Sequence, residues 1–429
     1  MTTSRRKFLG GALLAGAGGL MAGRSWGQER EFNPAIEEAR AAAMDVLQPK
    51  PQQLAHGLEL HRESIIFDIY GFSPNAAVDG NALATAAAAG VSDFQLQDMQ
   101  EDMHMTRHVT DAVELAEYKE AWEAAGVTCV FQNAGEEGND PLRLFKRLAR
   151  FTHVTDHLRD FVFKAVTPSD IEAAKKQNRR SLCLTGNGVP LAADFLSVPD
   201  ELRYLRTFYE LGIRMMHVTY NRRNLLGDGC AEPANGGLSD LGRAAIAEMN
   251  RLGIIVDVAH SGWRTSQEAA EASTKPIVAS HTACAGLHHH IRNKPAEVIK
   301  AIVEKGGVIG VCCIPNFLGG TADLAALLDH IDYLVQRVGI DHVAIGTDAG
   351  YRPARDSAEL RKVPARGRRP ERYESFWPPD ALGGKFPRAA SLAWTNWPLF
   401  TVGLVQRGYK DEDVQKIVGQ NMLRILRKA

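Results

Sequence analysis

The chain has 429 residues, of which 45% are hydrophobic and 24% are charged, and its formal net charge is −1. This composition is typical of a folded globular protein, and it excludes a disordered tail or a collagen-like repeat. A nucleic-acid-binding protein would carry a basic face or a high isoelectric point, and the balanced charge does not support either. We therefore expect a small-molecule partner and no nucleic acid.

The first 28 residues have the pattern of a targeting segment. Residues 4–9 read Ser-Arg-Arg-Lys-Phe-Leu, and an apolar stretch rich in glycine and alanine covers residues 10–23. This stretch is shorter than the about 20 residues that a membrane-spanning helix needs. The pair Arg5-Arg6 resembles a twin-arginine export signal. We expect residues 1–28 to be removed and the mature chain to be periplasmic or otherwise exported, without a stable membrane span. No clear cleavage motif precedes Gln28.

A polar, helix-forming lead-in covers residues 29–63, and eight short apolar runs follow it along the chain. Near-continuous apolarity is typical of strands in a parallel sheet that helices cover on both faces. Amphipathic stretches separate most of these runs, and several of the stretches end at glycine, as at Gly253 and Gly339. The eight runs are 64–71, 127–133, 181–187, 213–220, 254–260, 276–281, 307–315 and 342–348.

Eight strand–helix units in one chain predict an α/β fold, a closed (β/α)8 TIM barrel over residues 64–429. No GxGxxG motif follows the first run, so a dinucleotide-binding fold is disfavoured. Two insertions are expected, a helical one at about 80–110 and a second one at about 351–390. The second begins with an arginine-rich loop, which is either a solvated basic loop or a lid or anion-binding element.

Polar side chains end three of the runs, at the barrel face where this fold places its active sites. His260, His281 and Asp348 each follow an apolar strand pattern. Two imidazoles and a carboxylate at neighbouring strand ends predict a metal or acid–base site. We interpret His217, by contrast, as a packing residue. The triplet 288–290, three histidines in the loop after the sixth run, is either solvated or close to the site.

One arginine stands near the same face of the predicted barrel. Arg292 lies just beyond the histidine triplet, and a guanidinium in a barrel loop suits two hydrogen bonds to a substrate carboxylate.

Several segments of the chain carry a resemblance to the renal, or membrane, dipeptidase family of zinc metallopeptidases. They occur in order over more than 200 residues, and weaker similarity covers residues 63–188. The resemblance implies a barrel of the metal-dependent hydrolase type with a two-metal site that hydrolyses dipeptides. The segments are 202–203, 211–214, 237–242, 249–260, 280–281, 292–293, 346–348 and 419–424.

The resemblance also implies roles for four residues that match the family. It assigns His260 and His281 to one zinc ion, Arg292 to the substrate carboxylate and Asp348 to catalysis on the amine or the proton. Four other positions depart from the family pattern. Tyr70 and Phe72 stand where a His-x-Asp pair holds the other zinc, Asn187 stands at the bridging glutamate, and Tyr220 stands at a substrate-binding histidine.

These departures favour one metal ion, because two zinc ions in a poorly solvated pocket need anionic ligands to offset their charge. We expect one ion, zinc or a similar metal, on His260, His281 and Asp348. Two interpretations stay open. The chain is an exported dipeptidase-like hydrolase of a dipeptide or a similar small amide bearing a carboxylate, or it is a catalytically lapsed homologue that binds a peptide or small ligand. A homo-oligomer also stays open, because nothing in the sequence sets the oligomeric state.

Overall fold

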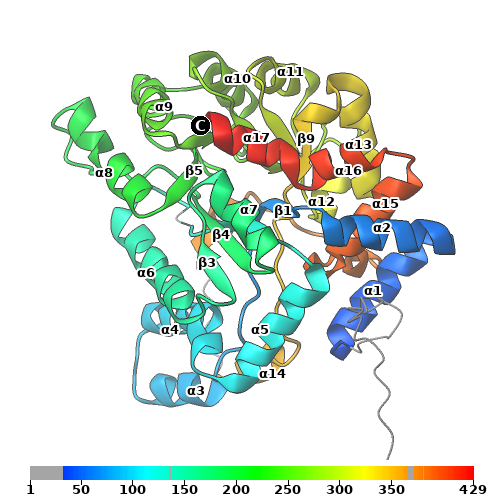
Figure 1. Cartoon of the computed structure of the whole chain (residues 1–429). Coiled ribbons are helices and arrows are strands. Elements are labelled where there is room, and N and C mark those ends of the chain that lie inside the picture. Colours follow the sequence, from blue (N-terminus) through cyan, green and yellow to red (C-terminus); the bar gives the residue numbers. More distant parts are fainter. Residues whose placement is uncertain (1–31, 136, 365–371, 380) are drawn as a thin grey trace, which may run out of the picture.

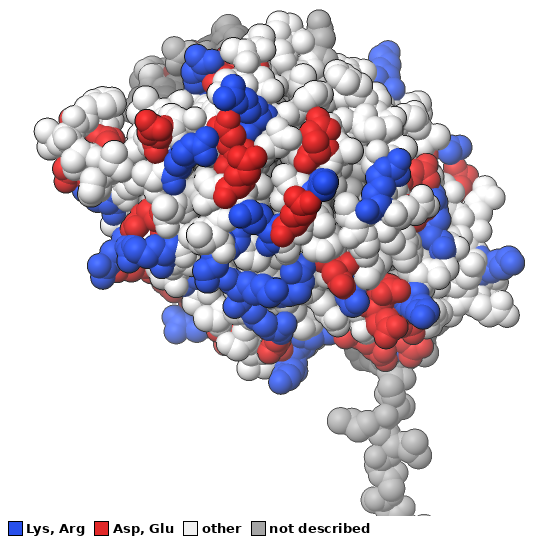
Figure 2. Space-filling view, turned by 90° about the horizontal axis from the view of Figure 1, so that it is seen from above, with Lys and Arg blue, Asp and Glu red and all other residues white. Residues whose placement is uncertain are grey.

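The computed structural model describes residues 32–135, 137–364, 372–379 and 381–429. The predicted export signal, with Arg5 and Arg6, lies outside the described residues and stays a prediction. In the described part of the chain, no helix combines the length and the apolar character needed to cross a bilayer. Basic and acidic side chains are interspersed over the face shown in Figure 2, in keeping with the balanced net charge.

Eight parallel strands form a near-closed barrel surrounded by helices (Figure 1), so the predicted (β/α)8 fold is confirmed. Hydrogen-bonded neighbours follow one another in chain order around the barrel, and each strand overlaps one of the predicted apolar runs. The strands are β1 (Phe67–Gly71), β2 (Cys129–Asn133), β4 (Arg180–Gly186), β5 (Ile213–His217), β6 (Ile255–Asp257), β7 (Val278–Thr282), β8 (Val308–Val311) and β9 (Val343–Ile345).

A ninth strand, which the sequence did not predict, lies outside this order. It is β3 (Val162–Lys164), and it pairs in parallel with the first half of β4. Lys164 interrupts the apolar residues around β3, so this segment lacks the near-continuous apolarity on which the prediction relied.

The helices begin and end where the capping residues of the sequence allow. The side chain of Ser239 accepts a hydrogen bond at the start of α9 (Asp240–Leu252), and Gly253, with φ of 88°, ends that helix in the left-handed conformation. The main helices are α1 (Pro34–Leu47), α2 (Pro51–Glu63), α3 (Gly80–Ala88), α4 (Asp93–Thr106), α5 (Ala112–Ala125), α6 (Pro141–His157), α7 (Pro168–Lys176), α8 (Val198–Glu210), α10 (Trp263–Ala272), α11 (Ala296–Glu304), α13 (Leu324–Val338), α15 (Trp397–Gln406) and α17 (Asn421–Lys428).

Shorter helical turns complete the fold, and some lie in the two predicted insertions. Helix α4 lies in the insertion between β1 and β2. Arg150 of α6, the helix after β2, forms ion pairs with Asp98 and Glu101 of α4, both at 3.0 Å. The short elements are η1 (Arg107–Val109), α12 (Pro315–Leu318), η2 (Ile340–His342), α14 (Asp356–Leu360), η3 (Arg372–Phe376), η4 (Ala389–Leu392), η5 (Trp394–Asn396), α16 (Asp411–Gln415) and η6 (Lys416–Gln420).

The amino-terminal end of the barrel is filled by apolar side chains and covered by α17. The first residues of several strands, among them Phe67, Cys129 and Val308, share one buried cluster with Met422 and Ile425 of α17. This packing removes apolar area from water at that end. The carboxyl ends of the strands are therefore the open face of the barrel.

The buried carboxylate of Asp68 joins the two ends of the barrel order. Its oxygens accept hydrogen bonds from the backbone nitrogen of Thr347 at 2.9 Å, the hydroxyl of Thr347 at 2.6 Å and the indole nitrogen of Trp394 at 3.0 Å. Burial raises the pKa of Asp68 to about 7, although these hydrogen bonds favour the ionised form. Beside it, the backbone nitrogen of Asp348 donates to the carbonyl of Tyr70 at 2.9 Å. Asp68 thus fixes the chain after β9 against β1.

We predict that Asp68→Asn lowers the free energy of unfolding by about 2 kcal/mol. The variant replaces one carboxylate oxygen by an NH2 group, so a donor of Thr347 or Trp394 loses its acceptor. The denaturation midpoint in urea, followed by circular dichroism, measures the change. Asp45→Asn is the matched control, since Asp45 is exposed on α1, and its effect should stay within about 0.5 kcal/mol. Equal midpoints for the two variants would contradict the closing role of Asp68.

Candidate functional site

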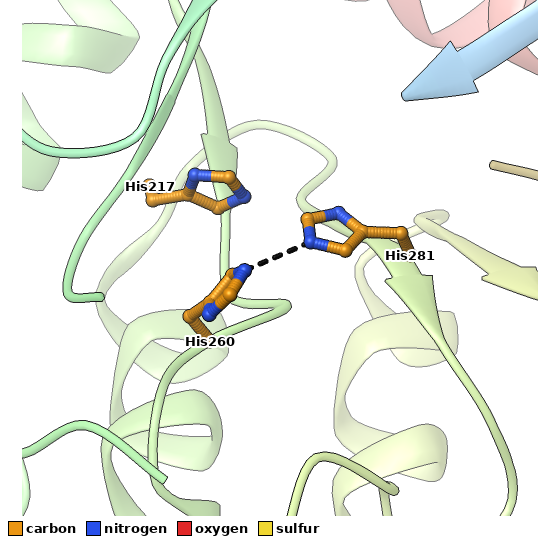
Figure 3. A group of neighbouring side chains, drawn as sticks. All are labelled: His217, His260 and His281. Atoms are coloured by element: carbon orange, nitrogen blue, oxygen red, sulfur yellow. Dashed lines mark hydrogen bonds between the residues drawn. The ribbon is translucent and has the colours of Figure 1, made fainter. Parts of the chain in front are cut away.

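Three buried histidines meet at the carboxyl ends of three neighbouring strands (Figure 3). His217 is the last residue of β5, His260 follows β6, and His281 lies in β7. One ring nitrogen from each lies within 4.8 Å of the others, and the Nε2 atoms of His260 and His281 are 2.9 Å apart. We name these three side chains the histidine cluster.

Hydrogen bonds to Nδ1 orient the imidazole rings of His260 and His281. The Nδ1 of His260 lies 2.7 Å from Oδ1 of Asn221, and the Nδ1 of His281 lies 2.7 Å from the hydroxyl of Ser280. An amide oxygen only accepts, so Nδ1 of His260 carries the proton and its Nε2 presents a lone pair to the cluster. The hydroxyl of Ser280 can donate or accept, so His281 can also present Nε2 as a lone pair.

His217 is placed differently, against a buried carboxylate. Its Nε2 lies 2.9 Å from Oδ2 of Asp257, but the alignment is not that of a hydrogen bond, and both ring nitrogens are without a partner. Burial acts to raise the pKa of Asp257, yet His217 and the hydrogen bonds from Ser280 hold it below its usual value. Buried polar atoms without partners are costly, and a bound cation would satisfy them.

The charge state of the cluster also suits a metal ion. Burial, together with the nearby Arg292, lowers the pKa of His260 and of His281 well below the usual value, so both imidazoles are neutral. Neutral imidazole is the form that binds zinc and similar ions. Three protein nitrogens with open coordination positions are typical of catalytic zinc sites. The residues of the histidine cluster therefore fit one divalent ion.

Asp348 lines the same pocket but lies outside the histidine cluster. It follows β9 in the left-handed conformation, with φ of 52°, and its side chain is half-buried. Burial raises its pKa to about 6, against the opposing effect of Arg292 and His217. In the expected metal site His217 takes the place that the sequence suggested for Asp348, and Asp348 is left as a carboxyl group that titrates near neutral pH.

Arg292 is fully buried behind the cluster and held by backbone oxygens. Its Nη2 donates to the carbonyl of His281 at 2.9 Å and its Nε to the carbonyl of Ala259 at 3.3 Å, while Nη1 is without a partner. The guanidinium also lies 5.0 Å from the ring centre of Phe317 and 5.8 Å from that of Trp377. Nη1 is thus the part of the guanidinium that has no hydrogen-bond partner among the described residues, and Arg292 is not among the residues that line the pocket.

The positions that depart from the family pattern line the other side of the site. The hydroxyl of Tyr70 donates to Oδ1 of Asn187 at 2.5 Å, and its ring stacks on His281 with centres 3.7 Å apart. Phe72 packs edge-on against Tyr70, with ring centres 6.2 Å apart. Tyr220 stacks on His260, with ring centres 4.0 Å apart. None of these four side chains brings a negative charge to the cluster.

A pocket of about 490 Å³ opens beside the cluster, and aromatic side chains supply much of its wall. Trp377, just after η3, lines it and stacks on Phe317 with ring centres 6.1 Å apart, and Phe376 contacts Tyr220. Phe376 and Trp377, which lie in the second insertion beyond its arginine-rich loop, therefore contribute to the surroundings of the site. Several arginines of that insertion, Arg366, Arg368 and Arg369, lie outside the described residues.

The geometry bears on two interpretations of histidines. The sequence pattern assigns His217 to packing, with the apolar run extending to Tyr220, whereas β5 ends at His217 and a ring nitrogen of this residue lies near those of His260 and His281. His217 pairs with Asp257 in the register of β5 and β6, and this register is visible only in the structure. The triplet 288–290 does not belong to the histidine cluster, and His290 instead lies 3.1 Å from the carbonyl of Ala381.

Comparison with known proteins gives a consistent result. The sequence model of the membrane dipeptidases, peptidase family M19, matches residues 78–361. The dipeptidase tcpJ of Claviceps purpurea is 28% identical over 230 residues, which are 52% of this chain and 47% of that protein. The chain spans about half the length of the curated relatives it matches.

Solved structures share the fold over most of the chain. An amidohydrolase from Pseudomonas aeruginosa has a TM-score of 0.63 at 28% identity, covering 87% of this chain and 98% of that one. The probable dipeptidase PvdM from the same organism has a TM-score of 0.62 at 20% identity, covering 88% and 99%. The barrel is therefore of the amidohydrolase, metal-dependent hydrolase type.

We predict that His217→Gln lowers zinc affinity at least tenfold, because the variant removes one of three nitrogen donors from the histidine cluster. Competition with a chromogenic chelator at neutral pH measures the affinity. The matched control is His289→Gln, a histidine of the exposed triplet, which should bind zinc like the wild type. Unchanged affinity in His217→Gln would show that His217 is not a ligand.

Proposed function

Since the chain belongs to the membrane dipeptidase family, whose members are metal-dependent, we propose that it is an exported metallohydrolase with a reduced site. Its substrate is a dipeptide or a similar small amide that bears a carboxylate. The observation that carries the proposal is the histidine cluster, which adjoins a pocket that also presents Asp348.

One metal ion, zinc or a similar divalent ion, would be held by His217, His260 and His281. When bound, it would supply a Lewis acid for the amide carbonyl and for water. A second ion lacks ligands, because the hydroxyl of Tyr70, the ring of Phe72 and the amide of Asn187 offset none of its charge. The side chains that face the family's second metal position are neutral, so one ion per chain is expected.

The remaining residues bind the substrate and move protons. The partnerless Nη1 of Arg292 is a donor for the substrate carboxylate, and the backbone bonds of its other nitrogens hold the guanidinium in place. Asp348 takes a proton from the attacking water and returns it to the leaving amine, because its pKa of about 6 lies close to neutral pH. The rings of Tyr220 and Trp377 limit the access of bulk water.

A second candidate function has its own supporting observation. Tyr70 stacks on His281 and is bonded to Asn187, so two positions at which the family has metal ligands carry neutral side chains here. A homologue that binds a peptide or a small carboxylate without turnover would have the same neutral wall. Hydrolysis separates the two candidates, because only the first predicts turnover that depends on metal.

The decisive experiment is hydrolysis of dipeptides by the zinc-loaded chain between pH 5 and pH 8, followed by release of free amino acids. We expect the rate to rise with pH through about 6, since Asp348 accepts a proton only when it is ionised. His260→Ala should lower the rate at least about 10²-fold, and Asp348→Asn should lower it and remove the rise near pH 6.

The zinc content at pH 5 is measured alongside, so that loss of the ion is not mistaken for titration of Asp348. His289→Gln and Asp45→Asn serve as controls and should keep the wild-type rate. Equal rates in the wild type and in His260→Ala would mean that this site does not carry the reaction. Two tightly held zinc ions per chain would contradict the reduced site.

Export is the part of the proposal that rests on residues 4–9 alone. We expect Arg5 and Arg6 to be required for passage to the periplasm, because the twin arginines are the feature that the export machinery recognises. Replacement of both by lysine, followed by fractionation of the cells, measures this requirement. Undiminished periplasmic protein in the variant would refute it, and replacement of Lys7 by arginine is the control.

A further inference from the structure

Tyr70 and Asn187 form a buried polar pair at the edge of the histidine cluster. Tyr70 lies in β1 and Asn187 directly follows β4, and their side chains are 1% and 3% exposed. The hydroxyl of Tyr70 donates to Oδ1 of Asn187 at 2.5 Å. The ring of Tyr70 lies nearly parallel to that of His281, at 16°, with centres 3.7 Å apart. The pair is thus in direct contact with the histidine cluster through the stacking of Tyr70 on His281.

The hydrogen bond determines which end of the amide faces the pocket. A tyrosine hydroxyl is protonated at neutral pH and donates to the amide oxygen. The oxygen and nitrogen of an amide are at opposite corners of one plane, so the NH2 group of Asn187 faces away from Tyr70. Asn187 lines the pocket together with His260 and Asp348, and no described residue accepts from its Nδ2. Two N–H donors are therefore presented where a substrate would lie.

These donors answer a requirement of the reaction. When water adds to the amide carbon, the carbonyl π electrons move to the oxygen, which becomes negatively charged. Donors that are fixed in advance around that oxygen stabilise it strongly in a pocket shielded from water. One metal ion contacts the oxygen from one direction only, so further donors must come from side chains, and the amide of Asn187 lines the pocket together with His260.

We infer that Asn187 is a catalytic residue whose amide donates to the carbonyl oxygen of the scissile amide, and that Tyr70 is the positioning residue that holds this amide. The inference rests on the proposed function. In the full step, a proton of water passes to Asp348 and then to the leaving nitrogen, the C–N bond breaks, and the carbonyl re-forms as the product acid. Asn187 gains and loses no atoms in this sequence.

The test uses the full zinc-loaded chain and a phosphinate analogue of Ala-Ala, whose tetrahedral oxygens resemble the charged oxygen of the reaction. Affinity is measured by calorimetry and kcat by dipeptide hydrolysis. Asn187→Asp has the same shape but accepts instead of donating, so we expect analogue affinity and kcat to fall about 10²-fold with little change in KM. The matched control is Asn81→Asp, since Asn81 of α3 is exposed, and its analogue affinity and kcat should equal those of the wild type.

Tyr70→Phe keeps the stacking ring and loses only the hydroxyl, so we expect a smaller loss, about tenfold. In the Asn187→Ala background, Tyr70→Phe should have no further effect, because its role acts through Asn187. The zinc content and the denaturation midpoint of each variant are measured, so that a lost ion or an unfolded chain is recognised. Tyr70→Phe serves as the test variant if Asn187→Asp does not fold.

Wild-type analogue affinity and kcat in a folded Asn187→Asp variant would overturn the inference, and additive effects of Tyr70→Phe and Asn187→Ala would overturn the positioning role. The proposed function fails separately. If no dipeptide is hydrolysed but the analogue binds in an Asn187-dependent way, the donor role stands and the hydrolase does not. If hydrolysis is unaffected by either variant, the hydrolase stands and the donor role does not.

Discussion

The carboxylate of Asp68 is the interaction on which the geometry of the site depends. The first and last strands of the barrel order are joined by its bonds to Thr347 and by backbone bonds beside it, rather than by a strand ladder among the described residues. Tyr70 stands two residues beyond Asp68 in β1, and Asp348 directly follows Thr347. A shift of β1 against β9 would therefore separate Asp348 from the pair of Tyr70 and Asn187.

Charge in the site is balanced over a short distance. Arg292 and Lys294 are buried near the histidine cluster, and burial lowers the pKa of Lys294 to about 7. A divalent ion added to these cations needs compensation, and Asp257 behind His217 and Asp348 across the pocket supply it. These two carboxylates match the +2 charge of one divalent ion, and Tyr70, Phe72 and Asn187 add no negative charge for a second.

The sequence predicted the parts of this arrangement that depend on local pattern. Eight apolar runs were sufficient to predict the eight barrel strands, and His260 and His281 stood out because they follow such runs directly. His217 did not stand out because Val218, Thr219 and Tyr220 extended the predicted run beyond the end of β5. The bond between Tyr70 and Asn187 joins residues 117 positions apart, and no periodicity carries that information. Family resemblance located both positions but not their contact.

The departures from the family pattern are easier to understand together than one at a time. Removing a single ligand from a two-metal site would leave a buried charge without its partner, which is strongly destabilising. Here a tyrosine, a phenylalanine and an asparagine stand at all three positions, and two of them satisfy each other by a hydrogen bond. The three side chains are neutral and pack against one another, so none of them needs a second ion as a partner. The NH2 group of Asn187, which lines the pocket, is left without an acceptor among the described residues.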